Sequence, residues 1–311
     1  MSSSSIPRSV VITGAGSGLG RELAILFSER GYTVFGTATR AAQVSELSEA
    51  TAGRVRLSVV DIADEAAVRG FVDAVSVSLG DAGLDVLISN AGILTPGPLE
   101  VLPISAIRHE FNVNVFGSLA VINGFLPALR GAKGRVLQLS SITAFFPLPF
   151  NGPSSASKAA LEAFADVYRA ELATCGVDFV MVIPGNMVTG GPAKTKAALQ
   201  QVADSLTPEQ QDLYGDPFAA FSEFMNAGQA GGLPAREAAE RVIELAEQVP
   251  APIRVAVGSD AEQILPMVKV TPDADLDAMR LQMIGLAHSP DAGADPVLTT
   301  ALVGVPGAEE L

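Results

Sequence analysis

Short, continuous apolar runs alternate along most of the chain with segments whose apolar side chains recur at helical spacing. The apolar runs favour buried strands at 9–16, 32–40, 55–62, 84–92, 134–141, 177–185 and 252–258. The segments at helical spacing predict helices at 17–31, 41–50, 65–80, 104–130, 154–174 and 235–249. Strands of this kind, separated by helices, are typical of a parallel sheet covered on both faces. We therefore predict an α/β fold, a doubly wound parallel sheet of about seven strands.

Two later segments depart from this alternation. Residues 186–233 are rich in apolar side chains and glycine, and we expect them to form a lid over a sizeable hydrophobic substrate. Residues 287–311 are rich in Gly, Ala and Pro, with weak patterning, and are interpreted as a C-terminal tail. No linker or repeat divides residues 1–286, so we expect one domain there.

The turn after the first predicted strand carries a glycine-rich motif, "TGAGSGLG" at 13–20. Glycines permit positive φ and close approach of the backbone to a ligand. The following helix start offers free N–H groups and a positive dipole end to a pyrophosphate. Since the motif follows a strand and opens a helix, it predicts a dinucleotide site. The expected contacts are Thr13, Gly14, Gly16, Ser17, Gly18, Leu19 and Gly20.

Net charge and cysteine content bear on the class of binding partner and on the cellular location. The chain has 311 residues, a net charge of −14 and a pI of about 4.5. This balance argues against nucleic-acid and anionic-membrane partners, which need basic patches. The single cysteine, Cys175, excludes an intrachain disulfide and fits a reducing, cytoplasmic location. "MSSSSIPR" lacks the apolar core of a signal peptide, and no uninterrupted apolar run reaches the roughly 18 residues of a membrane helix.

The end of the second predicted strand bears on the choice of dinucleotide. An NAD site usually has an acidic residue here, which accepts from the ribose hydroxyls. This chain has Thr39 and Arg40 instead. The forked donors of arginine can pair with a 2′-phosphate, so we favour NADP(H) over NAD(H). The alternative is that Arg40 is an ordinary solvated surface residue.

Taken in order, the motifs of residues 8–258 resemble the short-chain dehydrogenase/reductase family. The matching stretches are "TGAGSGLG" (13–20), "DI" (61–62), "NAG" (90–92), "NVNVFG" (112–117), "LSS" (139–141), "SASK" (155–158) and "PGNMVT" (184–189). The resemblance implies a Rossmann-type fold, an oxidoreductase activity, and a homodimer or homotetramer paired through the helices near 104–130 and 154–174. It also implies further dinucleotide contacts at Asp61, Ile62, Asn90, Ala91, Gly92, Lys158, Pro184, Gly185 and Thr189.

The same resemblance implies a catalytic set of Asn, Ser, Tyr and Lys. Asn114 matches the first member and would hold a water linked to the lysine. Ser141 matches the second and would bind the substrate oxygen, although its neighbour Ser140 competes for the assignment. Lys158 matches the fourth, where it would bind the nicotinamide ribose. The position of the tyrosine, four residues before the lysine, is occupied by Ser154.

This serine puts the chemistry in question, because an alkoxide formed by hydride delivery needs a positioned acid. A serine hydroxyl is a much weaker acid than tyrosine and its side chain is shorter. The chain's tyrosines are Tyr32, Tyr168 and Tyr214. Tyr214 falls in the predicted lid and is one candidate donor, and His109 is another.

Three hypotheses remain open at this point. The chain is an NADP(H)-dependent oxidoreductase of a carbonyl or alcohol whose tyrosine was replaced, or a natural variant for an imine or enone that needs less help from an acid. The third is a non-redox enzyme, such as a cyclase, dehydratase or isomerase, or a binding protein that uses the same pocket. The intact cofactor motifs favour the redox hypotheses.

Overall fold

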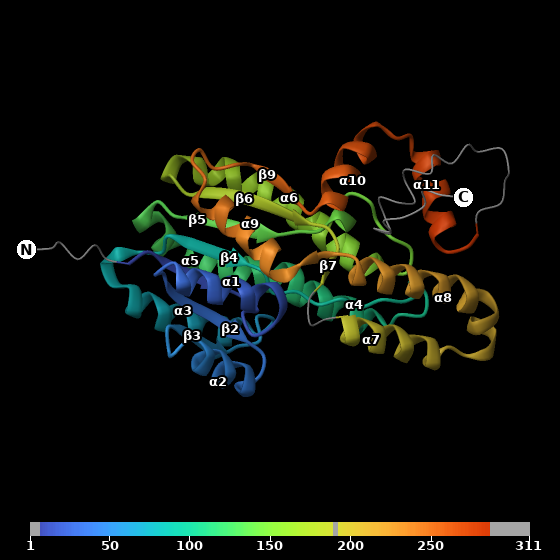
Figure 1. The fold of residues 1–311 in the computed structure, drawn as a ribbon, viewed down its shortest axis with the longest axis horizontal. Helices are drawn as coiled ribbons and strands as arrows, with labels where there is room; N and C mark the ends of the chain where they lie inside the picture. Colours follow the sequence, from blue (N-terminus) through green and yellow to red (C-terminus); the bar gives the residue numbers. More distant parts are fainter. Residues whose placement is uncertain (1–6, 189–191, 287–311) are drawn as a thin grey trace, which may run out of the picture.

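A single parallel sheet of seven strands forms the centre of the molecule (Figure 1). The computed structural model describes residues 7–188 and 192–286. The strand order is β3-β2-β1-β4-β5-β6-β9. The strands are β1 Ser9–Ile12, β2 Thr33–Ala38, β3 Val55–Val59, β4 Val86–Ser89, β5 Arg135–Leu139, β6 Asp178–Pro184 and β9 Arg254–Val257. The predicted doubly wound α/β fold is confirmed, with every predicted strand present and shorter at its ends.

Helices cover both faces of this sheet, as the apolar strands require. On one face, Leu23 and Phe27 of α1 (Gly18–Glu29) and Val242 of α9 (Ala235–Glu247) join one core. On the other face, Phe71 and Phe125 belong to a second core formed by α3 (Glu65–Leu79), α5 (Ser118–Ala132) and α6 (Gly152–Leu172). Helix α2 (Ala41–Ala50) packs beside β2 and β3. The strand order reverses between β1 and β4, which places a ligand crevice at their carboxyl ends.

The predicted lid is helical. Strand β7 (Met187–Val188) pairs with β8 (Leu233–Pro234), and the chain between them includes α7 (Pro192–Ser205) and α8 (Pro208–Ala230). These two helices lie side by side beyond the end of the sheet (Figure 1). With α10 (Ser259–Val270) and α11 (Asp273–Met283) they build a third apolar core around Phe218 and Phe221. Thr189 and the expected tail at 287–311 lie outside the described residues.

The predicted helix at 104–130 is one continuous helical run with an irregular middle. Helix α4 (Ile104–Phe111) leads into a π-helical turn at Asn112–Gly117, and α5 continues from it. By length and composition alone the run Ile104–Ala132 could cross a membrane, with a mean hydropathy of 1.3 in its most apolar window. Half of that window is buried inside the protein, as a core helix requires. A π-helical turn often marks a functional position, and this one contains Asn114.

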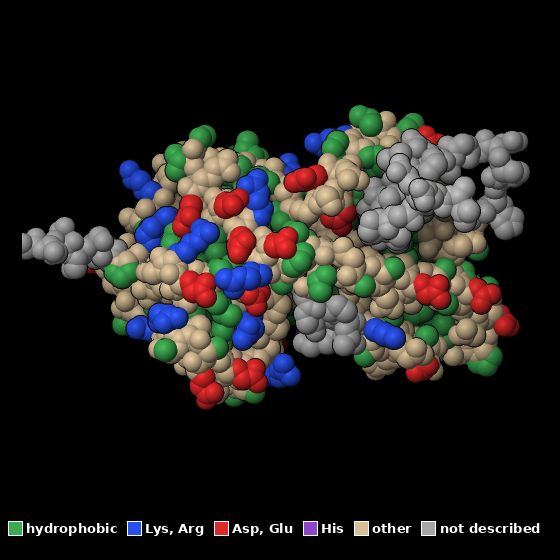
Figure 2. All heavy atoms as spheres, viewed as in Figure 1, with side chains coloured by type: hydrophobic (Ala, Val, Ile, Leu, Met, Phe, Trp, Pro, Cys, Tyr) green, Lys and Arg blue, Asp and Glu red, His purple; other side chains and the backbone are tan. Residues whose placement is uncertain are grey.

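Charges of both signs are interspersed on the face that carries α1 and α9 (Figure 2). Arg236 of α9 pairs with Glu22 and Glu29 of α1, at 3.9 and 3.4 Å. Arg30 pairs with Glu247 at 3.0 Å. Exposed pairs of this kind contribute little to stability. They leave this face without a large area of positive charge.

Two valines on α3 allow a matched test of how this helix packs in the second core. Val75 is 4% exposed in the second core, whereas Val77 is 83% exposed. We expect Val75→Ala to lower the free energy of unfolding by about 2 kcal/mol, because buried methyl groups and their packing are lost. Val77→Ala should change it by less than about 0.5 kcal/mol. Urea denaturation of both variants checks this, and equal effects would contradict the assignment of the α3 face.

Candidate active site

The glycine-rich turn after β1 brings the backbone close to the start of α1. Gly14 and Gly18 have positive φ, at 67° and 54°. A Cβ built on Gly20 would lie 2.4 Å from the carbonyl oxygen of Gly14, which only glycine avoids. The hydroxyl of Ser17, the residue before α1, makes no capping hydrogen bond. The first N–H groups of α1 are thus left for an anionic ligand, and the turn fits a dinucleotide pyrophosphate.

Thr13 links the two strands at the point where the order reverses. Its hydroxyl oxygen accepts from the backbone N–H groups of Asn90 and Ala91, at 2.9 and 3.0 Å. The amide of Asn90 donates in return to the Thr13 carbonyl at 2.9 Å. A Cβ on Gly14 would lie 3.0 Å from the Cα of Ala91. Thr13, Asn90 and Ala91 therefore fix the floor of the crevice, whatever contact they make with a ligand.

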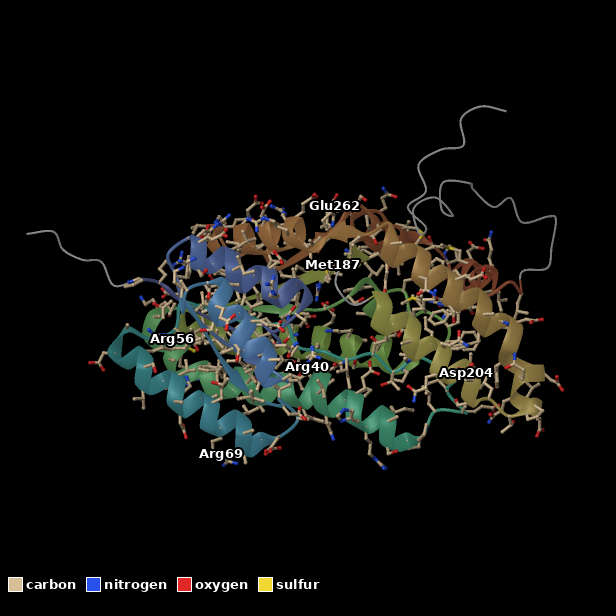
Figure 3. All side chains as sticks on the ribbon, turned by 60° about the horizontal axis from the view of Figure 1, so that its bottom comes forward. Arg40, Arg56, Arg69, Met187, Asp204 and Glu262 are labelled. Carbon is tan, nitrogen blue, oxygen red and sulfur yellow. The ribbon has the colours of Figure 1, made fainter. Side chains whose placement is uncertain are left out.

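The residues expected to hold the adenosine end lie after β2 and β3. Arg40 is exposed immediately before α2 (Figure 3). Asp61 is exposed, and its carboxylate accepts from the N–H of Ala63 at 2.9 Å. Ile62 is buried. At the other side of the crevice, Pro184 ends β6.

The position of the Asp260 carboxylate explains why residue 185, next to Pro184, is a glycine. A Cβ there would lie 1.9 Å from an oxygen of the Asp260 carboxylate. That carboxylate accepts from the N–H of Asn186 at 2.7 Å. Gly185 therefore admits Asp260 next to the strand end, a reason for glycine that does not involve a ligand.

The amide of Asn114 lies at the centre of a buried network. Its oxygen accepts from the N–H of Ile93 at 2.8 Å. Its nitrogen lies near three acceptors: the Ile93 carbonyl at 3.0 Å, Ser157 Oγ at 3.0 Å and Glu110 Oε1 at 3.2 Å. The hydroxyl of Ser157 in turn donates a hydrogen bond to the carbonyl of Ser154 at 2.9 Å. Asn114 thus connects α4 to the first turn of α6, which holds Ser154.

Gly92 leaves open the space between Asn114 and Lys158. A Cβ built on Gly92 would lie 3.3 Å from Asn114 Oδ1 and 3.7 Å from Lys158 Nζ. The ammonium group of Lys158 donates to the carbonyl of Leu139 at 2.9 Å and makes no second hydrogen bond within the described part of the chain. Burial lowers the pKa of Lys158 to about 8, although the carboxylates of Glu110 and Glu162 oppose the shift.

The two serines that end β5 have different environments. Ser141 Oγ accepts from the N–H and the hydroxyl of Thr143, at 3.1 and 3.0 Å. Its own proton has no acceptor among the described residues, so it can donate to a substrate oxygen. Ser140 is buried, and its hydroxyl makes no hydrogen bond to any described residue. Ser141 is the more exposed of the two, and its contact with the substrate stays a prediction.

None of the tyrosines takes the place next to Lys158. Tyr32 donates to Glu247 at 3.0 Å, and burial raises its pKa to about 12. Tyr168 stacks on Phe179 and donates to Asn123. Tyr214 contacts the edge of Phe150, and a hydrogen bond to Glu100 raises its pKa. His109 is exposed on α4.

An aromatic cluster joins the loop before α6 to α8. Phe150, two residues before α6, packs against Tyr214, Phe218 and Phe221 of α8, with ring centroids 6.3, 5.4 and 5.6 Å apart. Between α7 and α8 lies an open pocket of about 300 Å³, whose lining is mixed: it includes Leu199 and Phe218 but also Lys196, Gln200, Gln211 and Glu223.

Sequence reasoning missed Glu110 and Ser157, which both hydrogen-bond Asn114. The only available signals were an acidic residue one helical turn before Asn114 and the serine next to Lys158. Within residues 7–188 and 192–286, no cluster of three potential metal ligands occurs.

Comparison with known proteins places the chain in a family. Residues 8–200 match the family model described as short chain dehydrogenase. An NADPH-dependent 3-dehydrocapnine reductase from Ornithobacterium rhinotracheale is 31% identical over 242 residues, which are 76% of this chain and 83% of that protein.

Two solved structures of short-chain dehydrogenases hold different dinucleotides. One from Burkholderia cenocepacia J2315, in complex with NADP, has a TM-score of 0.66 and 26% identity, and the match covers 88% of this chain and 98% of that one. One from Burkholderia phymatum, in complex with NAD, has a TM-score of 0.71 and 20% identity, with 92% and 98% covered. The chain therefore belongs to the short-chain dehydrogenase family, an oxidoreductase family whose fold binds a nicotinamide dinucleotide.

Proposed function

We propose that the protein is an NADP(H)-dependent oxidoreductase acting on a carbonyl or alcohol, or on an enone or imine, of a hydrophobic small molecule. The observation that carries this proposal is the site of Lys158, partly buried beside Asn114 and Gly92 in a crevice with an intact glycine turn. Arg40, exposed after β2, supports NADP(H) over NAD(H). The NADPH-dependent relative supports the same choice.

The dinucleotide, when bound, would supply or accept the hydride. The residues of this chain then orient the substrate and manage the proton. The free proton of Ser141 donates to the substrate oxygen, and the two hydrogen bonds that its oxygen accepts strengthen that donation. Ser154, which stands where the resemblance implies tyrosine, is too weak an acid to protonate an alkoxide. With a pKa of about 8, the ammonium of Lys158 is an acid of suitable strength near neutral pH.

The surroundings support the substrate class and an assembly. Phe150 and Tyr214, the two partly exposed members of the aromatic cluster near the start of α6, support a hydrophobic substrate. Phe116, Phe164 and Val167 are 58%, 40% and 53% exposed on the two helical segments expected to pair. Covering them in a homodimer or homotetramer would remove this apolar surface from water. The net charge of −14 and the single cysteine support a cytoplasmic location without nucleic-acid or anionic-membrane partners.

A non-redox activity is the alternative, favoured by one observation. All three tyrosines have positions away from Lys158, so the acid that the family resemblance implies is absent. A cyclase, dehydratase, isomerase or binding protein could use Ser141, Lys158 and Asn114 to polarise an oxygen.

Substitution at position 154 distinguishes these functions. We expect the protein to consume NADPH slowly with some hydrophobic ketones, enones or imines, and Ser154→Tyr to raise the rate by roughly 100-fold, as a positioned acid does. Ser154→Phe is the matched control, because it fills the same space without an acid. The absorbance of NADPH reports the rate. Equal rates for the Tyr and Phe variants would show that position 154 supplies no proton, and a chain inert in all three forms would favour the non-redox function.

Substitution of Arg40 tests the choice of dinucleotide. We expect NADPH to bind at least about 10-fold more tightly than NADH, since a hydrogen bond between charged groups contributes about 1.5–3 kcal/mol. Arg40→Ala should remove this preference and leave NADH binding unchanged. Arg69→Ala, at an exposed arginine of α3, is the control. Titration of dinucleotide fluorescence measures the affinities of all three proteins for NADPH and NADH, and equal affinities in the unmodified protein would refute the assignment.

A further inference from the structure

Glu110 is a fully buried carboxyl group inside the site, on the last turn of α4. Its Oε1 accepts from Asn114 Nδ2 at 3.2 Å. Burial raises the pKa of Glu110, and hydrogen bonds from Thr95, the charge of Lys158 and the hydrogen bond from Asn114 oppose that shift. A carboxyl group is rarely fully buried without a partner that repays its desolvation.

The charges around Lys158 identify that partner. Two carboxylates act on its ammonium group, Glu110 from α4 and Glu162 from α6. Glu162 is already paired, because its Oε2 lies 2.8 Å from Nε of Arg254. No ion pair among the described residues includes Arg or Lys with Glu110. The charged groups of its own helix, Arg108 and His109, are exposed. Asn114, which binds Glu110, and Lys158 flank the same space beside Gly92, so Lys158 is the cation of the cluster that contains Glu110, without a direct ion pair between them.

We propose that Glu110 is a positioning residue that holds the Asn114 amide and supplies the counter-charge that keeps Lys158 protonated. The inference rests on the proposed function, since it assigns the supply of the proton to Lys158. In a site that lacks the tyrosine, the charge of Glu110 would set the pH range in which Lys158 holds this proton.

The sign of the effect follows from the two opposing influences on Lys158. Burial favours the neutral amine and lowers the pKa of Lys158, whereas the negative charge of Glu110 favours the ammonium form and raises it. Without the Glu110 charge, the pKa of Lys158 should fall further below its ordinary value. Lys158 would then lose its proton at a lower pH.

Glu110→Gln tests this, because glutamine keeps the volume and an oxygen acceptor for Asn114 but removes the charge. The readout is the pH titration of the Lys158 side-chain nitrogen by NMR in cofactor-free, ¹⁵N-lysine-labelled protein, with the signal assigned by its loss in Lys158→Arg. We expect the midpoint to fall by roughly one pH unit in Glu110→Gln and to stay near the original in Glu110→Asp. Asp73→Asn, which removes an exposed carboxylate on α3, should have no effect.

An unchanged or raised midpoint in Glu110→Gln would overturn the proposal. If that variant does not fold, the unmodified protein provides the test by infrared spectroscopy. A band from a buried, protonated carboxyl group at neutral pH would show that Glu110 carries no charge, and its absence would support the proposal. Neither measurement needs a substrate or NADPH. A shifted midpoint in a protein that consumes no NADPH would therefore refute the oxidoreductase function while the charge coupling holds.

Discussion

The hydrogen bonds of Thr13 join the carboxyl ends of β1 and β4, and the site depends on this junction. Strands β1 and β4 are neighbours, but the chain leaves them in opposite directions across the sheet, and a crevice opens where they part. Thr13 binds the backbone of Asn90 and Ala91 directly at that point. The glycine turn and the loop after β4 can therefore approach as closely as the Gly14–Ala91 contact requires. Every other site residue is positioned relative to these two segments.

A second constraint is the small number of charges that the interior accepts. Lys158 donates to the carbonyl of Leu139, and the charges of Glu110 and Glu162 also favour its ammonium form, so each offsets part of the cost of burial. Arg254 takes up the charge of Glu162, which leaves the α4 side and the α6 side of the lysine electrostatically different. The asymmetry comes from the fold, because Arg254, on the last strand of the sheet, pairs with Glu162 and Asp166, which both lie on α6.

The sequence predicted the sheet and its helices because each strand is a continuous apolar run with helical segments between. It also placed the glycine turn, Asn114, Ser141 and Lys158 in the parts of the fold where the structure has them. It did not predict α10 and α11, in which only Ala261, Ile264 and Leu276 are fully buried and pack in the third core with α8 and the loop before α6. Glu110 and Ser157 were missed for a related reason. Their roles come from contacts across α4 and α6, and no spacing along the chain reveals which polar residue on a helix will be buried.

Phe150 has a backbone conformation that couples two parts of the molecule. It has a φ of 57°, in the left-handed region that a bulky side chain seldom adopts. Its ring is held by three aromatic rings of α8, and its carbonyl accepts from the N–H of Gly97 at 2.8 Å. The loop before α6 is thus held at Phe150 in two ways, by the ring against α8 and by the carbonyl against Gly97. A displacement of α8 would pull on Phe150 and reach Ser154 within one helical turn, so the lid and the reacting end of α6 would respond to a substrate as one mechanical unit.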